Sequence, residues 1–279
     1  MKKNLFIRFA VMLISTLGVC LMLRQDVQAA TQPVTNNTSS SSSAKKQSVV
    51  TLYVGPDCKY TTISQAVEAA PEWSRIYIKN GIYTEAIKIT KNLTLTGESL
   101  GGVVIQFPCD SYLFPPLEAH CGRFENLVIQ ACGEETEASG SKSYAVHCEK
   151  MSSLHGSSIT FTNCVFESKG NWDVGMGSSN GFRATFNNCV FNGKGMFYHS
   201  YGKDAGCAIT STISLGGCVF APGTAFEVHN FYADNSKVNV IVRNTALPLG
   251  KIVSFSGGVG SPLVLDERQE AKNIVWNIK

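Results

Sequence analysis

The chain has 279 residues, including 24 Lys or Arg and 21 Asp or Glu. Four of the basic residues and one acidic residue fall within positions 1–29, so the rest carries 20 of each and no net charge. No basic stripe is present, which excludes nucleic acid as an expected partner. A neutral surface rich in Asn, Ser, Thr and aromatic residues suits a sugar polymer better.

Residues 1–29 predict a secretory signal peptide. Two lysines precede an apolar run from Leu5 to Leu23, and a small-x-small cleavage pattern ends at Ala29. A membrane anchor is the alternative because the run is long, but Arg24 and the cleavage pattern favour removal. We therefore expect a secreted protein, extracellular or associated with the cell envelope, with no membrane contact after cleavage.

Residues 30–48 are rich in Ser, Thr, Asn and Lys and hold almost no large apolar side chain. Such a segment cannot bury enough surface to fold, so we expect a flexible linker. Residues 49–279 are long enough to bury one core. We expect them to form a single domain and the protein to be a monomer.

One clear helix pattern lies between Tyr60 and Pro71. Apolar residues at positions 63, 66, 67 and 70 form one helical face, and Pro71 ends the helix. Short alternating strands follow from Arg75 to Ile89, with a turn at Asn80-Gly81. A helix in front of a run of strands predicts a cap over the open end of a repeat array.

A six-residue pattern recurs through the chain with Asn, or Gly217 in one copy, near its centre and apolar residues around it. Counted at the residue after the Asn, neighbouring copies lie 25 to 37 residues apart. Spacing of this kind with strand-like alternation predicts a β-solenoid. The Asn residues are expected at corners, where Asn tolerates a left-handed backbone and can bond along the stack. The copies are 124–129, 161–166, 186–191, 215–220 and 242–247, with a weaker one at 92–95.

Three cysteines, Cys164, Cys189 and Cys218, occupy the same position of this pattern. That placement predicts an interior ladder of small apolar thiols. The chain has no Cys-x-x-Cys pair, so we expect neither a zinc site nor another metal or cofactor.

A second strand recurs between the Asn copies, and alternate side chains of a strand share a face. We expect one set to point inward: Tyr144, Val146, Trp172, Val174, Met196, Tyr198, Phe226 and Val228. The other set is expected to point outward: Ala145, His147, Asp173, Gly175, Phe197, His199, Glu227 and His229.

The outward set supplies the candidate site. Carboxylates and imidazoles on neighbouring strands can act as general acid and base, which makes Asp173, His147 and His199 candidate catalytic residues. The alternative is a polar ladder on a solvated sheet. Candidate substrate-binding residues, which could contact or stack on sugar rings, are Glu227, His229, Phe197 and Tyr201.

The stretch from Tyr60 to Gly97 resembles the N-terminal part of the pectin methylesterase family. Its Thr62-Ile63, Ala69-Ala70-Pro71, Gly81-Ile82-Tyr83-Thr84-Glu85 and Leu93-Thr94-Leu95-Thr96-Gly97 match the family's motifs. The resemblance implies an all-β fold, the single-stranded right-handed parallel β-helix of pectin lyase-like proteins with an N-terminal capping helix. These residues cap and start the solenoid and carry no chemistry.

The resemblance also implies a catalytic set of two Asp, two Gln and an Arg, and most of it is missing here. The glutamines correspond to Tyr144 and Trp172, the acid/base Asp to Asp173, and the nucleophile to Met196 or Phe197. No segment like the family's Gly-Arg-Pro-Trp follows. Motifs of polygalacturonases and the clustered acids of pectate lyases are also missing. The stretch 144–200 is similar to uncharacterised β-helix proteins of bacteria and their phages.

The lead hypothesis is a secreted pectinesterase-like protein that binds or acts on extracellular polysaccharide, pectin-like or another acidic glycan, without pectin methylesterase activity. The first alternative is an active polysaccharide lyase or hydrolase that uses an Asp/His site. The second is a structural or adhesive surface solenoid.

Overall fold

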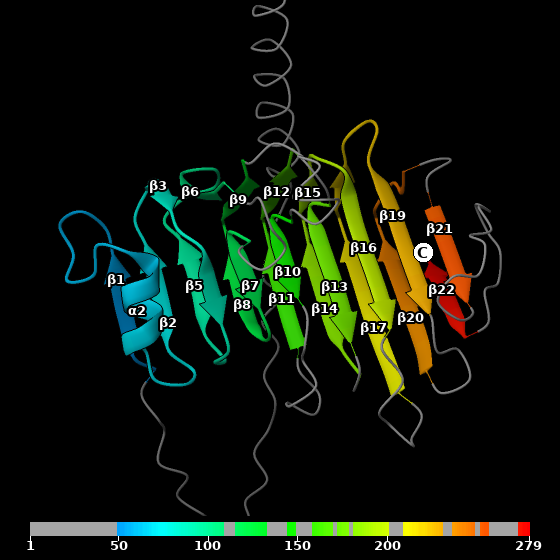
Figure 1. Ribbon diagram of the computed structural model, residues 1–279, viewed down its shortest axis with the longest axis horizontal. Coiled ribbons are helices and arrows are strands. Elements are labelled where there is room, and N and C mark those ends of the chain that lie inside the picture. The colour runs from blue at the N-terminus through cyan, green and yellow to red at the C-terminus, as the bar shows by residue number, and fades with distance from the viewer. Residues whose placement is uncertain are drawn as a thin grey trace, which may run out of the picture. The chain divides into compact units, whose positions relative to one another are not determined.

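The computed structural model describes residues 49–108, 115–132, 144–148, 158–169, 172–178, 181–200, 209–230, 236–248, 252–256 and 273–279. The predicted signal peptide and linker lie outside these residues. Every described strand belongs to one of three parallel sheets that run side by side (Figure 1). No helix of the described part is both long and apolar enough to cross a membrane.

The nine-stranded sheet contains β1 Thr51–Val54, β2 Arg75–Ile78, β5 Thr94–Gly97, β8 Gly122–Glu125, β11 Ser158–Thr162, β14 Arg183–Asn187, β17 Ile209–Gly216, β20 Ser236–Arg243 and β22 Ile274–Ile278. The seven-stranded sheet contains β4 Ile87–Ile89, β7 Leu117–Ala119, β10 Val146–Cys148, β13 Val174–Ser178, β16 Gly195–Ser200, β19 Ala225–Asn230 and β21 Ile252–Ser256. The six-stranded sheet contains β3 Gly81–Thr84, β6 Val103–Phe107, β9 Val128–Ala131, β12 Val165–Ser168, β15 Val190–Phe191 and β18 Val219–Phe220.

From β2 to β20, the chain visits the three sheets in rotation, so each coil adds one strand to each sheet. Parallel strands joined in this way close a single-stranded β-helix, and the connections between parallel strands are right-handed. The predicted right-handed parallel β-helix with a helix at its N-terminal end is therefore confirmed.

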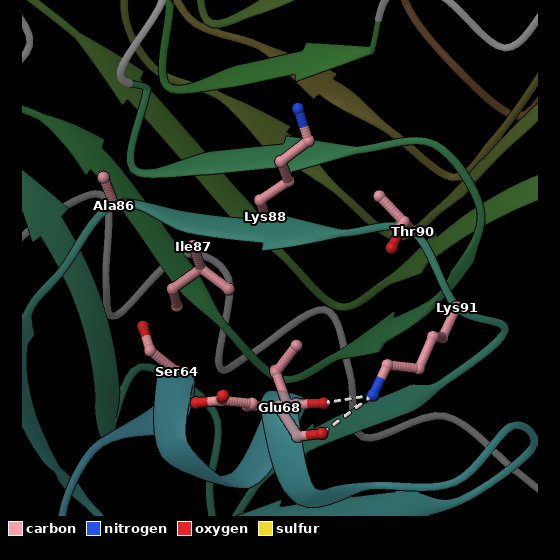
Figure 2. Close-up of a pocket in the computed structure, with 8 residues that line it drawn as sticks. Ser64, Glu68, Ala86, Ile87, Lys88, Thr90 and Lys91 are labelled. Carbon is pink, nitrogen blue, oxygen red and sulfur yellow. Dashed lines mark hydrogen bonds between the residues drawn. The ribbon is translucent and has the colours of Figure 1, made fainter.

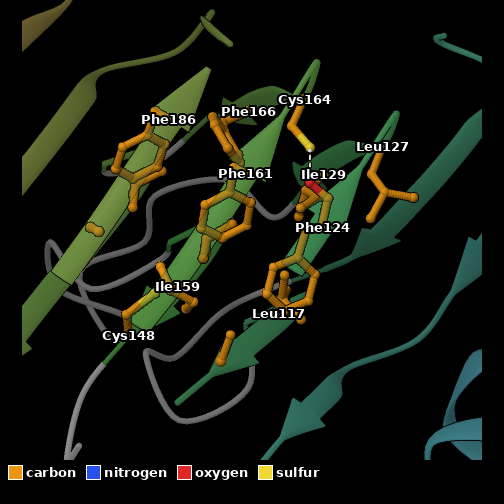
Figure 3. Close-up of a cluster of buried hydrophobic side chains, with 14 of the residues drawn as sticks. Leu117, Phe124, Leu127, Ile129, Cys148, Ile159, Phe161, Cys164, Phe166 and Phe186 are labelled. Atoms are coloured by element: carbon orange, nitrogen blue, oxygen red, sulfur yellow. Dashed lines mark hydrogen bonds between the residues drawn. The ribbon is translucent and has the colours of Figure 1, made fainter. Parts of the chain in front are cut away.

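The Asn-centred copies stack in the predicted register. Phe124, Phe161, Phe186, Leu215 and Val242 are direct partners on neighbouring strands. Phe124 stacks on Phe161 with ring centroids 4.9 Å apart, and Phe161 stacks on Phe186 at 5.3 Å (Figure 3). All five side chains are buried, so each coil fills its interior only through its neighbours.

The thiol ladder is confirmed as well. Cys164 and Cys189 are fully buried, Cys218 is 3% exposed, and all three are free thiols. Sγ of Cys164 donates to the carbonyl of Phe124 at 3.5 Å, as the dashed line in Figure 3 shows. The cysteines therefore act as small core residues with weak donors.

The asparagines stand at the corners, as predicted. Asn126, Asn163, Asn188 and Asn244 have φ values of 59°, 54°, 51° and 48°, in the left-handed region. Their side chains bond along the stack, with Nδ2 of Asn163 donating to Oδ1 of Asn126 at 3.2 Å and Nδ2 of Asn188 donating to Oδ1 of Asn163 at 3.4 Å.

The weaker copy predicted at 92–95 does not align with the other copies, because Asn92 does not stand at the corner position that Asn126 takes. Leu95 pairs with Phe124, so Gly97 stands at the position that Asn126 takes one coil later. A Cβ at Gly97 would lie 2.3 Å from the carbonyl oxygen of Asn126, which explains why Gly is needed there. Asn92 lies before β5, and its amide donates to the carboxylate of Glu72 at 2.9 Å.

The capping helix is α2 Ile63–Ala69, and the side chain of Thr62 accepts from the amide of Gln65 at its N-terminus. Glu85, the acid of the Gly-x-Tyr-x-Glu motif, accepts from the amides of Ile63 at 2.8 Å and Ser64 at 2.9 Å. At the other end, Nζ of Lys91 donates to the carbonyls of Val67 and Glu68 at 2.8 and 3.0 Å (Figure 2). It also donates to the carbonyl of Ala70 at 2.8 Å. The motif thus attaches the cap to the first coil.

Candidate functional site: the outer face of the seven-stranded sheet

The outer face of the seven-stranded sheet gathers most of the chemically active side chains. Six residues form one continuous register row across it: Lys88, Glu118, His147, Gly175, Phe197 and Glu227. Two positions further along the chain lie His120, directly after β7, and Gly177, His199 and His229. Four of the five histidines therefore belong to this face, which we call the histidine face, although His147 and His229 are buried, with 8% and 7% of their surface exposed. The fifth, His155, lies outside the described residues.

Aromatic rings cover the middle and the C-terminal part of the histidine face. Phe197 stacks on Trp172 at 5.8 Å and on His199 at 5.2 Å, and meets His229 edge-on at 4.8 Å. The ring of Tyr144 stacks on His147 at 5.2 Å with an angle of 8° between the planes. Such rings offer flat apolar surface with polar groups at the edge, which suits the C–H faces and hydroxyls of sugars.

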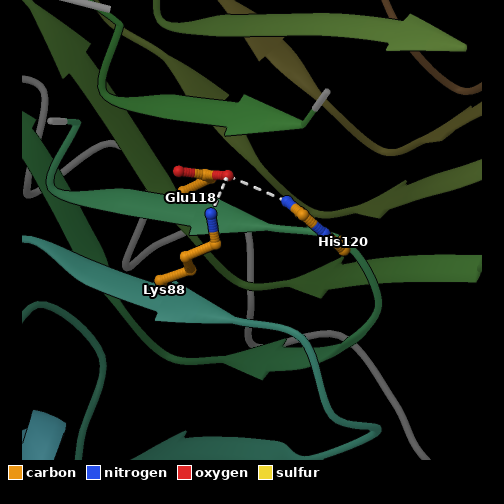
Figure 4. Close-up of polar contacts among 3 residues, drawn as sticks. All are labelled: Lys88, Glu118 and His120. Carbon is orange, nitrogen blue, oxygen red and sulfur yellow. Dashed lines mark hydrogen bonds and ion pairs between the residues drawn. The ribbon is translucent and has the colours of Figure 1, made fainter. Parts of the chain in front are cut away.

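A polar cluster occupies the N-terminal part of the same face (Figure 4). Oε1 of Glu118 lies 2.9 Å from Nζ of Lys88 and 2.8 Å from Nε2 of His120. The hydrogen bond with His120, aided by Lys88, lowers the pKa of Glu118 to about 2. Glu118 is therefore a fixed anion that orients an imidazole and an ammonium group.

A second carboxylate–imidazole pair lies at the other end of the face. Oε2 of Glu227 is 3.1 Å from Nε2 of His229, and the register places His199 beside His229. A carboxylate that holds an imidazole in one orientation is a common arrangement for proton transfer and for binding hydroxyl groups.

Asp173 does not join these residues. It lies in the bend before β13 and is fully buried. Its Oδ1 accepts from the amide of Ser168 at 2.8 Å, and its Oδ2 accepts from the amides of Gly193 and Gly195, each at 2.9 Å. Burial raises the pKa of Asp173 to about 7, while the three amides act in the opposite direction.

The expected outward orientation of Asp173 is wrong, and so is that of Ala145. Alternation holds only within an extended strand, whereas both residues lie in the bends that precede β13 and β10. For the same reason Tyr144 and Trp172, expected inside, lie on the outer face against His147 and Phe197.

The expected alignment of β13 with β16 is wrong by two residues. Val174 pairs with Met196 and Met176 pairs with Tyr198, so Trp172 is not the partner of Met196. A shift of two preserves the face on which each strand residue lies. The burial expected for Met196, Tyr198, Phe226 and Val228 is accordingly found.

The structure brings only part of the predicted site together. His199, Phe197, Glu227 and His229 are neighbours, whereas β13 separates His147 from them. Tyr201, expected to bind substrate, lies outside the described residues. Lys88, Glu118 and His120 were missed because β7 has three residues and no repeat motif. The Glu-x-His spacing shared by 118–120 and 227–229 is the signal that could have found them.

The described residues contain no group of three His, Cys, Asp or Glu arranged to hold a metal ion. The chemistry that the histidine face offers is hydrogen bonding, stacking and proton transfer by imidazole.

Comparisons with known proteins point to one family. No protein-family model matches the chain. The probable pectinesterase/pectinesterase inhibitor 64 of Arabidopsis thaliana is 37% identical over 59 residues, which cover 18% of this chain and 10% of the relative. The chain therefore matches only a tenth of that protein's length. The resemblance to pectinesterases seen in the sequence is confirmed.

Solved structures with the same architecture include three pectin methylesterases. The carrot enzyme has a TM-score of 0.44 and 13% identity, covering 86% of this chain and 90% of its own. The Erwinia chrysanthemi enzyme has a TM-score of 0.42 and 16% identity, with 80% and 93% covered. The Aspergillus niger enzyme has a TM-score of 0.40 and 17% identity, with 84% and 90% covered. The parallel β-helix of this chain follows from its own sheet topology.

Proposed function

We propose that this protein is an extracellular, pectinesterase-like β-helix that binds polysaccharide on the histidine face and has no pectin methylesterase activity. The observation that carries the proposal is the cluster of Trp172, Phe197, His199, Glu227 and His229 on one outer sheet face. Stacked aromatic rings beside fixed hydrogen-bonding groups are what a surface needs to hold a sugar chain.

The residues at the family's catalytic positions support binding without ester cleavage. Met196 and Phe197 stand where the resemblance puts the nucleophile, and neither side chain can attack a carbonyl. Asp173 stands at the acid/base position, but its carboxylate is buried among three backbone amides. A group enclosed in this way cannot reach a substrate on the outer face.

The extracellular location is part of the same proposal. It rests on the predicted signal peptide in residues 1–29. The polysaccharide partner is supported by the similarity to the Arabidopsis pectinesterase and by the chemistry of the histidine face.

A glycan array, together with an assay for methanol release from methyl-esterified pectin, tests the proposal. We expect binding to at least one polysaccharide and no methanol above the buffer control. Methanol release by the purified protein would refute the inactive interpretation. A blank array would refute the binding interpretation and favour a purely structural solenoid.

A second candidate function is polysaccharide cleavage, a lyase or hydrolase reaction. The observation that favours it is the Glu227–His229 pair with His199 on the next strand, since this is an acid/base arrangement. The predicted set of catalytic residues changes in this case, because Asp173 is enclosed and Glu227 would supply the carboxylate instead. Glu227→Gln and His199→Ala should each abolish product formation from the bound polysaccharide; unchanged cleavage would remove this candidate.

A further inference from the structure

The histidine face carries two carboxylate–imidazole pairs built in the same way. Glu118 on β7 and His120 directly after it have the same spacing along the chain as Glu227 and His229 on β19. The two glutamates stand in one register row, separated by β10, β13 and β16. Four strand spacings put the two pairs roughly 19 Å apart along the solenoid.

The two glutamates are similarly accessible from outside, whereas His229 is more buried than His120. The side chains of Glu118 and His120 are 20% and 14% exposed, and those of Glu227 and His229 are 22% and 9% exposed. Each pair presents a carboxylate, which accepts hydrogen bonds, next to an imidazole, which can donate or accept one. Pairs of this type match the hydroxyl groups of a sugar ring.

The surface between the pairs is suited to a continuous ligand. His147, Phe197 and His199 line it, and Gly175 lies at its centre. A Cβ on Gly175 would lie 2.6 Å from the ring of Tyr144, so the glycine allows that aromatic ring to lie down over β13. The result is a track of rings from one pair to the other.

The charges on this track disfavour an anionic polymer. Lys88 is the one Lys or Arg among the described residues of the two register rows, and it is already ion-paired with Glu118. Glu227 adds a second carboxylate, and its ion-pair partner among the described residues is His229. On the described part of this face, an unesterified polyuronate would meet two carboxylates against the single ammonium of Lys88, and like charges repel.

We infer that Glu118–His120 and Glu227–His229 are two contact points for one linear, uncharged glycan that runs along the solenoid between them. The inference rests on the proposed function and names the class of polysaccharide that the face takes. It assigns a binding role to Glu118, His120 and Lys88, which lie outside the predicted site.

The test uses size-graded oligosaccharides of methyl-esterified homogalacturonan, xylan and cellulose, with unesterified oligogalacturonate as the anionic comparison. Affinity, measured by calorimetry, should rise about tenfold or more once the oligomer exceeds roughly 19 Å. Esterified oligomers should bind more tightly than unesterified ones. Length-independent affinity, or tighter binding of the unesterified form, would overturn the inference.

Matched variants locate the two contacts. Glu118→Ala should lower the affinity of long oligomers about tenfold and so remove most of the gain with length, whereas Glu227→Ala should weaken short and long oligomers alike. Glu167→Ala is the control, because Glu167 is a half-buried outward glutamate of the six-stranded sheet that accepts from Gln130 at 3.0 Å. Equal behaviour of Glu118→Ala and Glu167→Ala would overturn the inference while leaving array binding, and with it the proposed function, intact. A blank array would sink both.

Discussion

Two carboxylates associated with the seven-stranded sheet have opposite environments. Glu118 lies on the histidine face, where His120 and Lys88 lower its pKa to about 2. Asp173 lies in the bend under the same sheet, where burial raises its pKa to about 7. The first is held by side chains and faces outward, whereas the second is held by backbone amides and faces inward.

The difference separates a residue that can meet a ligand from one that holds the coil together. Asp173 connects the end of β12, through Ser168, to the segment that starts β16, through Gly193 and Gly195. It therefore fixes the strand that carries Phe197 and His199. Glu118 connects only surface side chains, so its loss should affect the surface more than the coil.

The largest expected effect is the loss of the Asp173 carboxylate. Asp173→Ala should lower the free energy of unfolding by about 3–5 kcal/mol, because three backbone amides are left buried without an acceptor. Denaturant unfolding measures this, with Asp57→Ala as the control, since Asp57 is exposed. A loss equal to that of the control would show that the Asp173 contacts do not stabilise the coil.

The pH dependence of stability should reveal the same carboxylate. Since burial raises the pKa of Asp173 from 3.8 to about 7, its contribution is fully present below about pH 4 and is lost as the pH rises through 7. The free energy of unfolding should fall by roughly 2–4 kcal/mol over this window. Asp173→Asn should flatten this part of the curve; an equally steep fall in the variant would assign it to another group.

Gly193 tests how closely the chain approaches the Asp173 carboxylate in the bend. A Cβ there would lie 2.2 Å from Oδ1 of Asp173 and 2.6 Å from the carbonyl oxygen of Ser168, which cannot move freely. Gly193→Ala should therefore cost about 2 kcal/mol of unfolding free energy. Gly216→Ala is the control, because a Cβ on Gly216 would have its nearest neighbour 3.5 Å away. Gly101→Ala is unsuitable, because Gly101 has a positive φ. Equal losses in the two variants would contradict the proposed close approach.

The smallest expected effect belongs to Glu118. Its pKa is lowered from 4.5 to about 2, so its contribution is present above pH 4.5 and is lost as the pH falls through 2. Solvent screening at this partly exposed position limits the effect to about 1 kcal/mol. In Glu118→Gln, this fall in the free energy of unfolding at acid pH should be absent. If the variant and the unmodified protein lose the same free energy between pH 4.5 and 2, the ion pair contributes nothing to folding.

The stacking of the coils could be predicted from the sequence because it depends on short-range periodicity. The aromatic residues at 124, 161 and 186, the Asn corners and the thiol ladder all repeat within extended segments, where alternation fixes the face. The sequence also identified Phe197, His199, Glu227 and His229 on one outer face, since β16 and β19 are long enough to show the alternation.

The remaining part of the site could not be predicted because it depends on bends and on short strands. Tyr144, Asp173 and Trp172 precede their strands, so counting by alternate residues assigned each of them to the wrong side. Glu118 belongs to a strand of three residues and His120 follows it directly, and such a strand is too short to show a period. Coils of unequal length also hid the two-residue shift between β13 and β16.

The most direct test of the account is the polysaccharide affinity of Phe197→Thr, a change that keeps a β-former on the strand but removes the central ring of the histidine face. Tyr77→Thr is the matched control, because Tyr77 is a half-buried aromatic residue on the nine-stranded sheet. The account predicts about a tenfold weaker affinity for Phe197→Thr than for Tyr77→Thr, with both variants folded. Equal affinities would contradict the assignment of binding to this face.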